Sequence, residues 1–347
     1  MLPHPIKLTD NPGPYLRLYL EKWQFSKIMV LVDENTNAQC YPLIRDFIPV
    51  HVVVQVESGE ENKTLATCEK IWSAMTDHAL DRHSILIILG GGVLGDMGGF
   101  CAATYKRGIE FILIPTTLLA LADASIGGKL GIDFHGFKNH IGTFREPWLN
   151  LMYSGFLKTL PEAELRSGFA EVIKHALISD KLLWNELRTR KLNDQPWDML
   201  LRHSAEFKSS VTQQDPTEKG LRKILNAGHT IGHALETYFL QNGPRILHGE
   251  AVAAGLVCEG FLAREAGTIT QDELDELSGY ILKEYGKLPV PQEGIATVAA
   301  LCVQDKKNKG NKILTVLLNG IGQARWDCEV SLDQIADALA FYRSLQT

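Results

Sequence analysis

The chain has 347 residues, 45% of them apolar and 22% charged, and a formal net charge of −6 at pH 7. This length exceeds the usual size of one domain, so the sequence predicts two. The negative net charge argues against nucleic acid or an acidic membrane surface as a partner. No apolar run reaches the roughly 18–20 residues of a membrane span. Residues 1–23 are rich in proline and lack an apolar core, so we expect no signal peptide.

The cysteines form no C-x-x-C pair and no dense cluster. This distribution predicts reduced, mostly buried thiols in a cytoplasmic protein. Any metal ion must therefore be held by histidines and carboxylates. The cysteines are Cys40, Cys68, Cys101, Cys258, Cys302 and Cys328.

Four short runs in the first 115 residues are nearly continuous in apolar character: Ile28–Val32, His51–Val56, Ile85–Leu89 and Phe111–Ile114. Such runs are typical of strands in a parallel sheet that is covered on both faces. The intervals between them are long enough for crossover helices. We therefore predict a doubly wound α/β domain.

The second half of the chain is predicted to be mainly helical. Thr159, Pro161 and Glu162 match a capping box in which Thr159 is the N-cap of a helix. Apolar periodicity predicts further helices over about 180–212, 218–240, 249–266, 271–285 and 331–345, and one strand over Ile313–Leu318. We expect the domains to span residues 1–158 and 159–347.

A glycine-rich loop, Gly90-Gly91-Gly92, follows the third strand, and Asp96 and two further glycines come soon after it. Glycines at a strand end let backbone N–H groups approach a pyrophosphate, which the next helix N-terminus also favours. The spacing differs from the G-x-G-x-x-G fingerprint, and a tight turn with close helix–sheet packing is the alternative. The carboxyl ends of the first two strands carry polar side chains where a ribose is expected, namely Asp33, Asn35, Glu60 and Lys63.

A second polar stretch follows the fourth strand, from Pro115-Thr116-Thr117 through Asp123 to Lys129, Lys138 and Asn139. Two lysines among flexible glycines can act as point charges on a phosphate. The same residues could equally be a solvated loop, and the pattern alone does not decide between the two.

Glu171 and Lys174 share the polar face of the helix that follows residue 160, and three histidines come later. His229 and His233 are one helical turn apart, and His248 precedes another apolar helix. A carboxylate with two imidazoles and an open position is the usual shell of a catalytic zinc ion. Spacing favours Glu171, His229 and His233 as ligands, with His248 in place of His233 as the other possible set. Thr230 stands where the zincin motif needs glutamate, so hydrolysis is not indicated.

Several motifs together resemble those of the 3-dehydroquinate synthase family. They are GGGVLGDMGGF, ATYKRG, PTTLLA, DASIGGK, KNHIG, TLPEAELRSGFAEVIKHALI, LRKILNAGHTIGHALE, HGEAVAAG and DKKNKGNKILTVLLNGIG. They run in order from about Asp33 to Ile321. The resemblance implies an NAD-binding α/β domain followed by a helical metal domain. It also implies a homodimer.

The resemblance assigns roles to individual residues. It implies that zinc, or cobalt as the alternative, is held by Glu171, His229 and His248. For NAD, the matching positions are Asp33, Asn35, Glu60, Lys63, Gly91, Gly92, Val93, Asp96, Thr116, Thr117, Leu119, Asp123, Lys129, Lys138, Asn139, Thr159 and Glu164. For the substrate they are Arg107 (lent across the dimer interface), Lys129, Asn139, Lys174, Lys208, Arg222, Asn226, His233 and one of Lys306 and Lys307.

The implied reaction converts 3-deoxy-D-arabino-heptulosonate 7-phosphate to 3-dehydroquinate and phosphate, a step of the shikimate pathway. It proceeds by transient oxidation with NAD, phosphate elimination, reduction and intramolecular aldol closure. Alternatives are another sugar-phosphate cyclase that makes a cyclitol, a metal-dependent polyol or glycerol-phosphate dehydrogenase, or an inactive binding protein. Arg222 and Lys208 argue against the first, His233 and the lysines against the second, and the intact ligand set against the third.

This sequence departs from the family pattern at three positions. Ala124 replaces a serine, Leu130 a threonine and Asp133 an asparagine. None of the three changes removes a charged group, so we expect at most an altered grip on NAD.

Overall fold

The computed structural model describes residues 6–135, 137–303 and 312–346. Contacts divide the chain into two compact units. One consists of Met1–Leu165 with Trp197–Ser209, and the other of Arg166–Pro196 with Ser210–Thr347. Within the described ranges, no helix combines the length and hydropathy needed to cross a bilayer.

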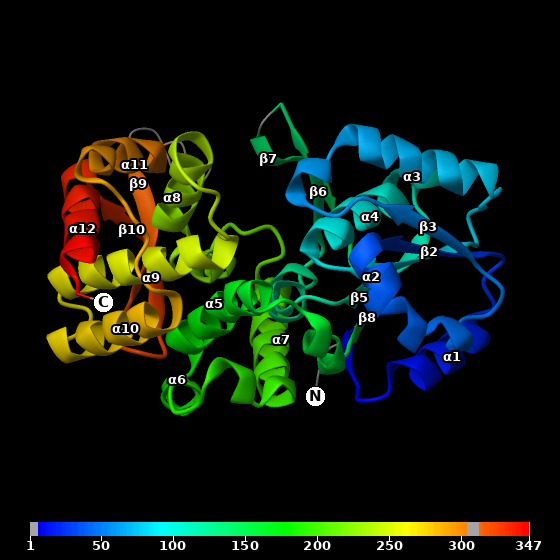
Figure 1. The fold of residues 1–347 in the computed structure, drawn as a ribbon, viewed down its shortest axis with the longest axis horizontal. Coiled ribbons are helices and arrows are strands. Elements are labelled where there is room, and N and C mark those ends of the chain that lie inside the picture. The colour runs from blue at the N-terminus through cyan, green and yellow to red at the C-terminus, as the bar shows by residue number, and fades with distance from the viewer. Residues whose placement is uncertain (1–5, 136, 304–311, 347) are drawn as a thin grey trace. The chain divides into compact units, whose positions relative to one another are not determined.

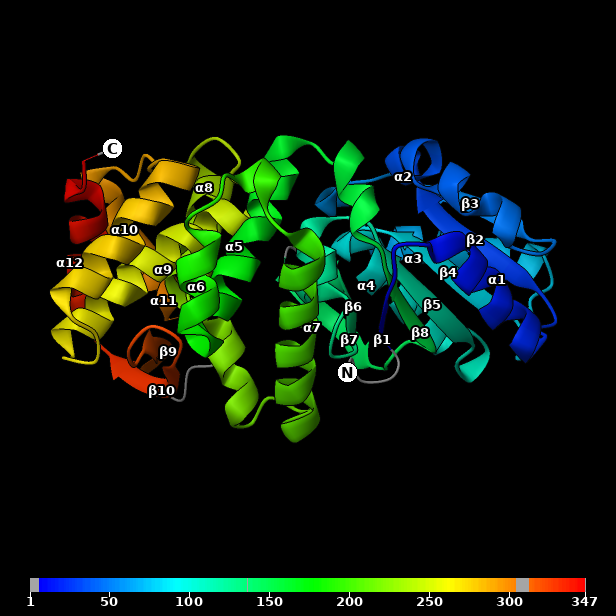
Figure 2. The same cartoon turned by 90° about the horizontal axis from the view of Figure 1, so that it is seen from below.

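The first unit is built on a six-stranded parallel sheet in the order β1-β8-β5-β4-β2-β3 (Figure 2). The four predicted runs are confirmed as strands of this sheet. Two edge-side strands were missed, because three or four residues are too few to show a pattern. The strands are β1 (Ile6–Leu8), β2 (Ile28–Asp33), β3 (Val52–Val56), β4 (Ile85–Gly90), β5 (Glu110–Pro115) and β8 (Leu149–Met152).

Helices cover both faces of this sheet, as the buried strands require (Figure 1). On β2, Met29 and Leu31 join one apolar cluster, and Val30 and Val32 join the other. The first cluster is closed by α3 (Leu65–Asp77) and α4 (Gly92–Thr104), the second by α1 (Pro12–Trp23). The short α2 (Glu34–Gln39) directly follows β2. The predicted α/β class is thereby confirmed.

An antiparallel hairpin, which the sequence did not predict, follows β5 in the same unit. It consists of β6 (Lys129–Phe134) and β7 (Phe137–Phe144), with a register shift between Ile132 and Phe134. Leu130 and Ile132 of β6 belong to the apolar cluster under α4. The hairpin is therefore anchored on the domain core by its first strand.

The second unit is mainly helical, as predicted, and α9 lies at its centre, packed against α8, α10, α12 and β9 (Figure 1). The expected helix over 180–212 is two helices, interrupted before Pro196, and the expected strand is paired with a second one. The elements are α5 (Glu162–Ser179, beginning in the first unit), α6 (Lys181–Leu187), α7 (Trp197–Gln214, shared between the units), α8 (His229–Asn242), α9 (His248–Glu265), α10 (Gln271–Tyr285), α11 (Ile295–Cys302), α12 (Leu332–Ser344), β9 (Ile313–Leu318) and β10 (Ala324–Val330).

The predicted capping box at the start of α5 is wrong. Thr159 is the last residue of a 3-10 helix (Ser154–Thr159), and its hydroxyl donates to the Phe156 carbonyl oxygen at 3.3 Å. The α-helix begins only at Glu162, and its first helical hydrogen bond runs from Leu165 N–H to the Pro161 carbonyl oxygen. The threonine hydroxyl is thus used by the preceding turn and does not cap α5.

Helices α8 and α9 cross with their backbones almost in contact. A Cβ atom on Gly255 of α9 would collide with the carbonyl oxygen of Gly228, directly before α8. A Cβ on Gly232 of α8 would lie 3.0 Å from the Ala251 carbonyl oxygen. Because backbone atoms cannot move aside as a flexible side chain can, only glycine permits this crossing.

We expect Gly255→Ala to lower the free energy of unfolding by about 1–3 kcal/mol, the usual cost of overpacking. Gly279→Ala on α10 is the matched control, since no atom lies within 4 Å of its would-be Cβ. There the better helix propensity of alanine should add about 0.5–1 kcal/mol. Chemical denaturation measures both variants. Equal stability of Gly255→Ala and the wild type would contradict the close crossing.

Candidate active site

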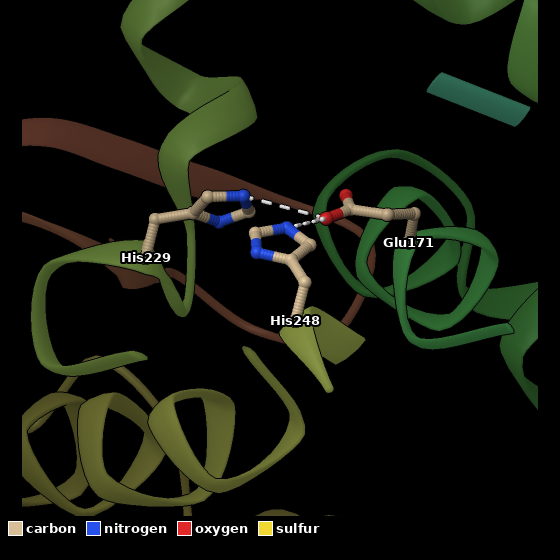
Figure 3. Close-up of side chains that lie close together, drawn as sticks. All are labelled: Glu171, His229 and His248. Carbon is tan, nitrogen blue, oxygen red and sulfur yellow. Dashed lines mark hydrogen bonds and ion pairs between the residues drawn. The ribbon is translucent and has the colours of Figure 1, made fainter. Parts of the chain in front are cut away.

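Glu171, His229 and His248 meet in the second unit, although each comes from a different helix (Figure 3). Glu171 lies in the middle of α5, while His229 and His248 are the first residues of α8 and α9. The Nε2 atoms of His229 and His248 lie 3.3 and 3.2 Å from Glu171 Oε1. All three ligand atoms fall within 4.8 Å of one another. This is a donor set that can hold one divalent metal ion.

Neighbouring groups orient the two imidazoles. His229 Nδ1 lies 2.9 Å from the Ala227 carbonyl oxygen, which can only accept, so Nδ1 carries the proton and Nε2 faces Glu171. His248 Nδ1 lies 3.4 Å from Glu236 Oε2, which orients this ring in the same way. Histidine ligands of metal ions usually have such partners on the other ring nitrogen. The arrangement therefore fits a metal site both in its donor atoms and in the groups that orient the two rings.

The Glu171 carboxylate is buried and is neutralised from two sides. Lys174, one turn further along α5, pairs with Oε2, while the histidines face Oε1. Burial alone would raise the pKa of Glu171, but Lys174 and His229 outweigh it and hold the pKa well below its usual value. The carboxylate is thus an anion at neutral pH and is ready to bind a cation.

The two histidines titrate in opposite directions. Burial lowers the pKa of His229, so its ring is neutral. Burial also acts to lower the pKa of His248, but hydrogen bonds to Glu171 and Glu236 outweigh it and raise the pKa to about 10. Without a metal the site therefore holds one imidazolium proton, which a bound cation would displace.

His233, which spacing favoured as a ligand, takes a different position. It is exposed on α8, and its ring centroid lies 5.2 Å from that of His229 and 6.0 Å from that of His248. It groups with Glu236 and His248 rather than with Glu171. The geometry of the described residues thus favours His248 as the third ligand beside Glu171 and His229.

The loop before α8 carries further predicted substrate residues. Arg222 is buried, and its guanidinium donates to the Pro216 carbonyl oxygen at 2.9 Å. Asn226 Nδ2 donates to Glu218 Oε1 at 2.7 Å. The Asp215 carboxylate accepts from the backbone N–H groups of Lys219, Gly220 and Arg222 and so shapes the loop. Sequence reasoning missed Asp215 and Glu218, although Asp-Pro followed by glycine is a turn signal.

In the first unit the glycine-rich loop joins β4 to α4. Gly91 is the N-cap of α4 and offers no side-chain acceptor, so the first N–H groups of the helix have no side-chain cap. A Cβ on Gly91 would lie 2.9 Å from Thr117 Cγ2, and one on Gly92 would lie 3.2 Å from Ala124 Cβ. A pocket at this strand end is lined by Gly90, Gly91, Gly92, Asp96, Pro115, Ala124, Ser125, Lys129 and Arg145, among others. A helix N-terminus beside a lysine favours an anion.

An ion pair between the buried Lys63 and the partly buried Asp96 lies beside this loop. Lys63 Nζ is 2.7 Å from Asp96 Oδ2 on α4 and 2.6 Å from Asn139 Oδ1 on β7. Burial lowers the pKa of Lys63, but Asp96 and Glu60 outweigh it and raise the pKa. Burial raises the pKa of Asp96, and Lys63 opposes this effect. The lysine thus ties the glycine-loop helix to the hairpin.

Most remaining predicted positions lie at the carboxyl ends of the parallel strands or just beyond them. Asp33 ends β2 and caps α2 by accepting from Thr36 N–H at 2.7 Å, and Lys138 lies 3.9 Å from Glu60. Lys208 pairs with Asp123 at 2.8 Å. Asn35 is on α2, Val93 is on α4 and Glu164 is on α5. Thr116 and Thr117 follow β5, and Leu119 precedes a π-helical turn. Thr159 and Arg107 each end a 3-10 helix, Arg107 with φ +68°. Lys306 and Lys307 lie outside the described residues.

Comparison with known proteins covers most of the chain. Models of the 3-dehydroquinate synthase N-terminal and C-terminal domains match residues 53–167 and 168–308. The chain is similar to the 3-dehydroquinate synthase of Parabacteroides distasonis, with 39% identity over 94% of either chain. The chain belongs to the 3-dehydroquinate synthase family. It is also 38% identical to the 3-dehydroquinate synthase of Ruminiclostridium cellulolyticum, over 96% of this chain and 97% of that one.

A related cyclase shares the fold over nearly the full length. The structure of 2-epi-5-epi-valiolone synthase from Streptomyces hygroscopicus, with NAD+ and Zn2+ bound, is 26% identical. Its TM-score is 0.86, with 99% of this chain and 97% of that chain covered. The fold of this chain is thus shared with 2-epi-5-epi-valiolone synthase, an enzyme named for a different product.

The structure gives each departure from the 3-dehydroquinate synthase pattern a local setting. Ala124 faces Gly92 at the start of α4, and Leu130 fills the notch that Gly99 leaves. Asp133 Oδ1 accepts from Asn139 N–H at 2.8 Å and supports the positive φ of Asn139. Ala124 therefore packs at the start of α4, Leu130 packs against the middle of α4, and Asp133 bonds within the hairpin.

We expect Lys63→Met to lower the free energy of unfolding by about 1–3 kcal/mol at neutral pH, because Asp96 loses its buried partner. Loss of the lysine raises the pKa of Asp96 further above the value of about 3.9 in the unfolded chain. The native variant then holds this proton to a higher pH than the native wild type, in which the pKa of Asp96 is itself already raised. The deficit therefore grows as pH rises through the wild-type pKa of Asp96 and shrinks below it. Denaturant titrations across this pH range measure it.

Lys223→Met is the matched control, since Lys223 pairs at 2.7 Å with the exposed Asp327. A surface pair of this kind should cost less than about 1 kcal/mol. A pH-independent deficit in Lys63→Met, or one no larger than in the control, would contradict the ion pair of Lys63 with Asp96.

Proposed function

We propose that this chain converts 3-deoxy-D-arabino-heptulosonate 7-phosphate to 3-dehydroquinate and phosphate. The proposal is carried by the meeting of Glu171, His229 and His248 in a chain that resembles 3-dehydroquinate synthases over almost its full length. The family similarity suggests the substrate, and the cluster supplies the chemistry that the reaction needs. The active form is proposed to be a homodimer, with Arg107 acting across its interface.

The proposed cofactors are NAD and one divalent metal ion, which the related valiolone synthase holds as NAD+ and Zn2+. Zinc suits the nitrogen and carboxylate donors of Glu171, His229 and His248, and cobalt suits the same shell. The backbone N–H groups at the start of α4 are proposed to receive the pyrophosphate of NAD. When bound, NAD reversibly accepts a hydride and the metal lowers the pKa of a coordinated hydroxyl.

The side chains of this protein are proposed to hold the substrate while phosphate leaves. The guanidinium of Arg222 has the planar fork that suits a carboxylate, and it is buried, where such a pair is strong. Lys129, His233 and one of Lys306 and Lys307 are proposed to hold the phosphate as a positioned leaving group. Lys174 keeps Glu171 ionised, as its pairing with Oε2 allows.

We expect phosphate release from the heptulosonate phosphate to require NAD and yet to leave no NADH in the steady state. The reason is that the ring carbon is oxidised and reduced again in one turnover. Phosphate assays and NADH absorbance, followed in the same reaction, measure both quantities. Stoichiometric NADH would instead indicate a dehydrogenase, and faster turnover of a carboxylate-free sugar phosphate would indicate another cyclase.

We expect His248→Ala to lose the bound metal, because this variant removes one of the three clustered donors. His233→Ala should keep a metal content close to that of the wild type. It should lose activity, because His233 is proposed to hold the phosphate of the substrate. Metal analysis of the purified variants, with NAD binding as a control for folding, separates the two histidines. If His233→Ala lost the metal and His248→Ala kept it, the ligand set would be Glu171, His229 and His233.

A further inference from the structure

Helix α8, which begins with the proposed ligand His229, has no side-chain cap from its own segment. Gly228 precedes it with φ +76°, and this residue has no side chain to accept the free N–H groups. The first turn of any helix leaves backbone donors without a helical partner. When they are buried, something else must satisfy them.

The missing cap is supplied by Glu259 of α9, a residue to which the sequence analysis gave no role. Its Oε2 accepts from Gly228 N–H at 2.6 Å. Its Oε1 accepts from Thr230 N–H at 3.1 Å and Ile231 N–H at 3.4 Å. Glu259 is only 3% exposed, so its charge is balanced inside the protein by these donors and by the positive end of the helix.

His229 lies between two of the residues that Glu259 holds. Gly228 and Thr230 flank it in the chain, and the Ala227 carbonyl oxygen, which orients its ring, comes just before them. A shift at this helix start would therefore move His229 and its hydrogen-bond acceptor together. The close crossing at Gly255, one turn before Glu259 on α9, leaves the carboxylate within reach of these donors.

We propose that Glu259 is a positioning residue of the metal site. Its carboxylate fixes the start of α8, and with it the place of His229, relative to the helix that also carries His248. One helix, α9, thus provides one ligand directly and anchors a second. This inference rests on the metal site proposed above.

The test is cobalt binding to the full-length, metal-free protein. We expect Glu259→Gln to bind Co2+ about 10–100-fold more weakly, as is usual when a supporting contact of a ligand is lost. The visible spectrum of bound Co2+ should also change, because the amide turns an N–H donor toward backbone donors and distorts the ligand geometry. Should Glu259→Gln not fold, Glu259→Asp, which keeps the charge on a shorter arm, should show the same changes to a smaller degree.

Glu273→Gln is the matched control. Glu273 accepts from Thr270 N–H at 3.1 Å and so caps α10, which carries none of the proposed ligands. Its loss should reduce stability and leave Co2+ affinity and spectrum unchanged. Wild-type affinity and spectrum in the Glu259 variants would overturn the inference and leave the proposed function intact. If the wild type bound no Co2+, or Glu171→Ala still bound it with wild-type affinity, the proposed metal site itself would be wrong.

Discussion

The buried charge of Glu171 is the constraint on which the second unit is organised. An isolated carboxylate is costly inside a protein, so this one requires cationic or hydrogen-bonding groups around both oxygens. Lys174 meets this need at one oxygen, and the protonated ring of His248 does so at the other, where the neutral ring of His229 also presents its Nε2 atom. Both histidines are the first residues of their helices, so the groups around this carboxylate include the starts of α8 and α9. The metal-binding donors are therefore brought together before any metal is bound.

The fold also requires that helix backbones approach one another closely, and glycine makes this possible. Gly255 lets α9 touch the residues before α8, and Gly98 and Gly99 let α4 lie on Leu31 and Leu130. In both units the helix held so closely begins at a predicted binding site. Close packing and site geometry therefore depend on the same residues, and a glycine-rich motif here reflects both packing and binding.

Sequence patterns predicted the fold well where a single element carries the signal. The strands β2, β3, β4 and β5 followed from nearly continuous apolar runs, and the helical second half followed from hydrophobic periodicity. The very short β1 and β8 could not be found in this way, and the apparent cap at Thr159 failed because a preceding 3-10 turn competes for the hydroxyl. Local patterns cannot weigh two overlapping uses of one side chain.

The candidate site shows the same limit more sharply. Periodicity compares residues on one helix, so it paired His229 with His233, whereas His248 reaches Glu171 from a different helix. Spacing offered His248 only as the alternative to His233, and the family resemblance was needed to prefer it. The groups that support the ligands were harder still to predict from the sequence. Ala227 acts through its backbone carbonyl, and Glu259 lies among the apolar residues of α9. Motifs record which residues bear the chemistry, while the groups that aim them are defined by tertiary contacts. Two family members with the same ligands can therefore differ in metal affinity through a residue such as Glu259, which lies outside the motifs.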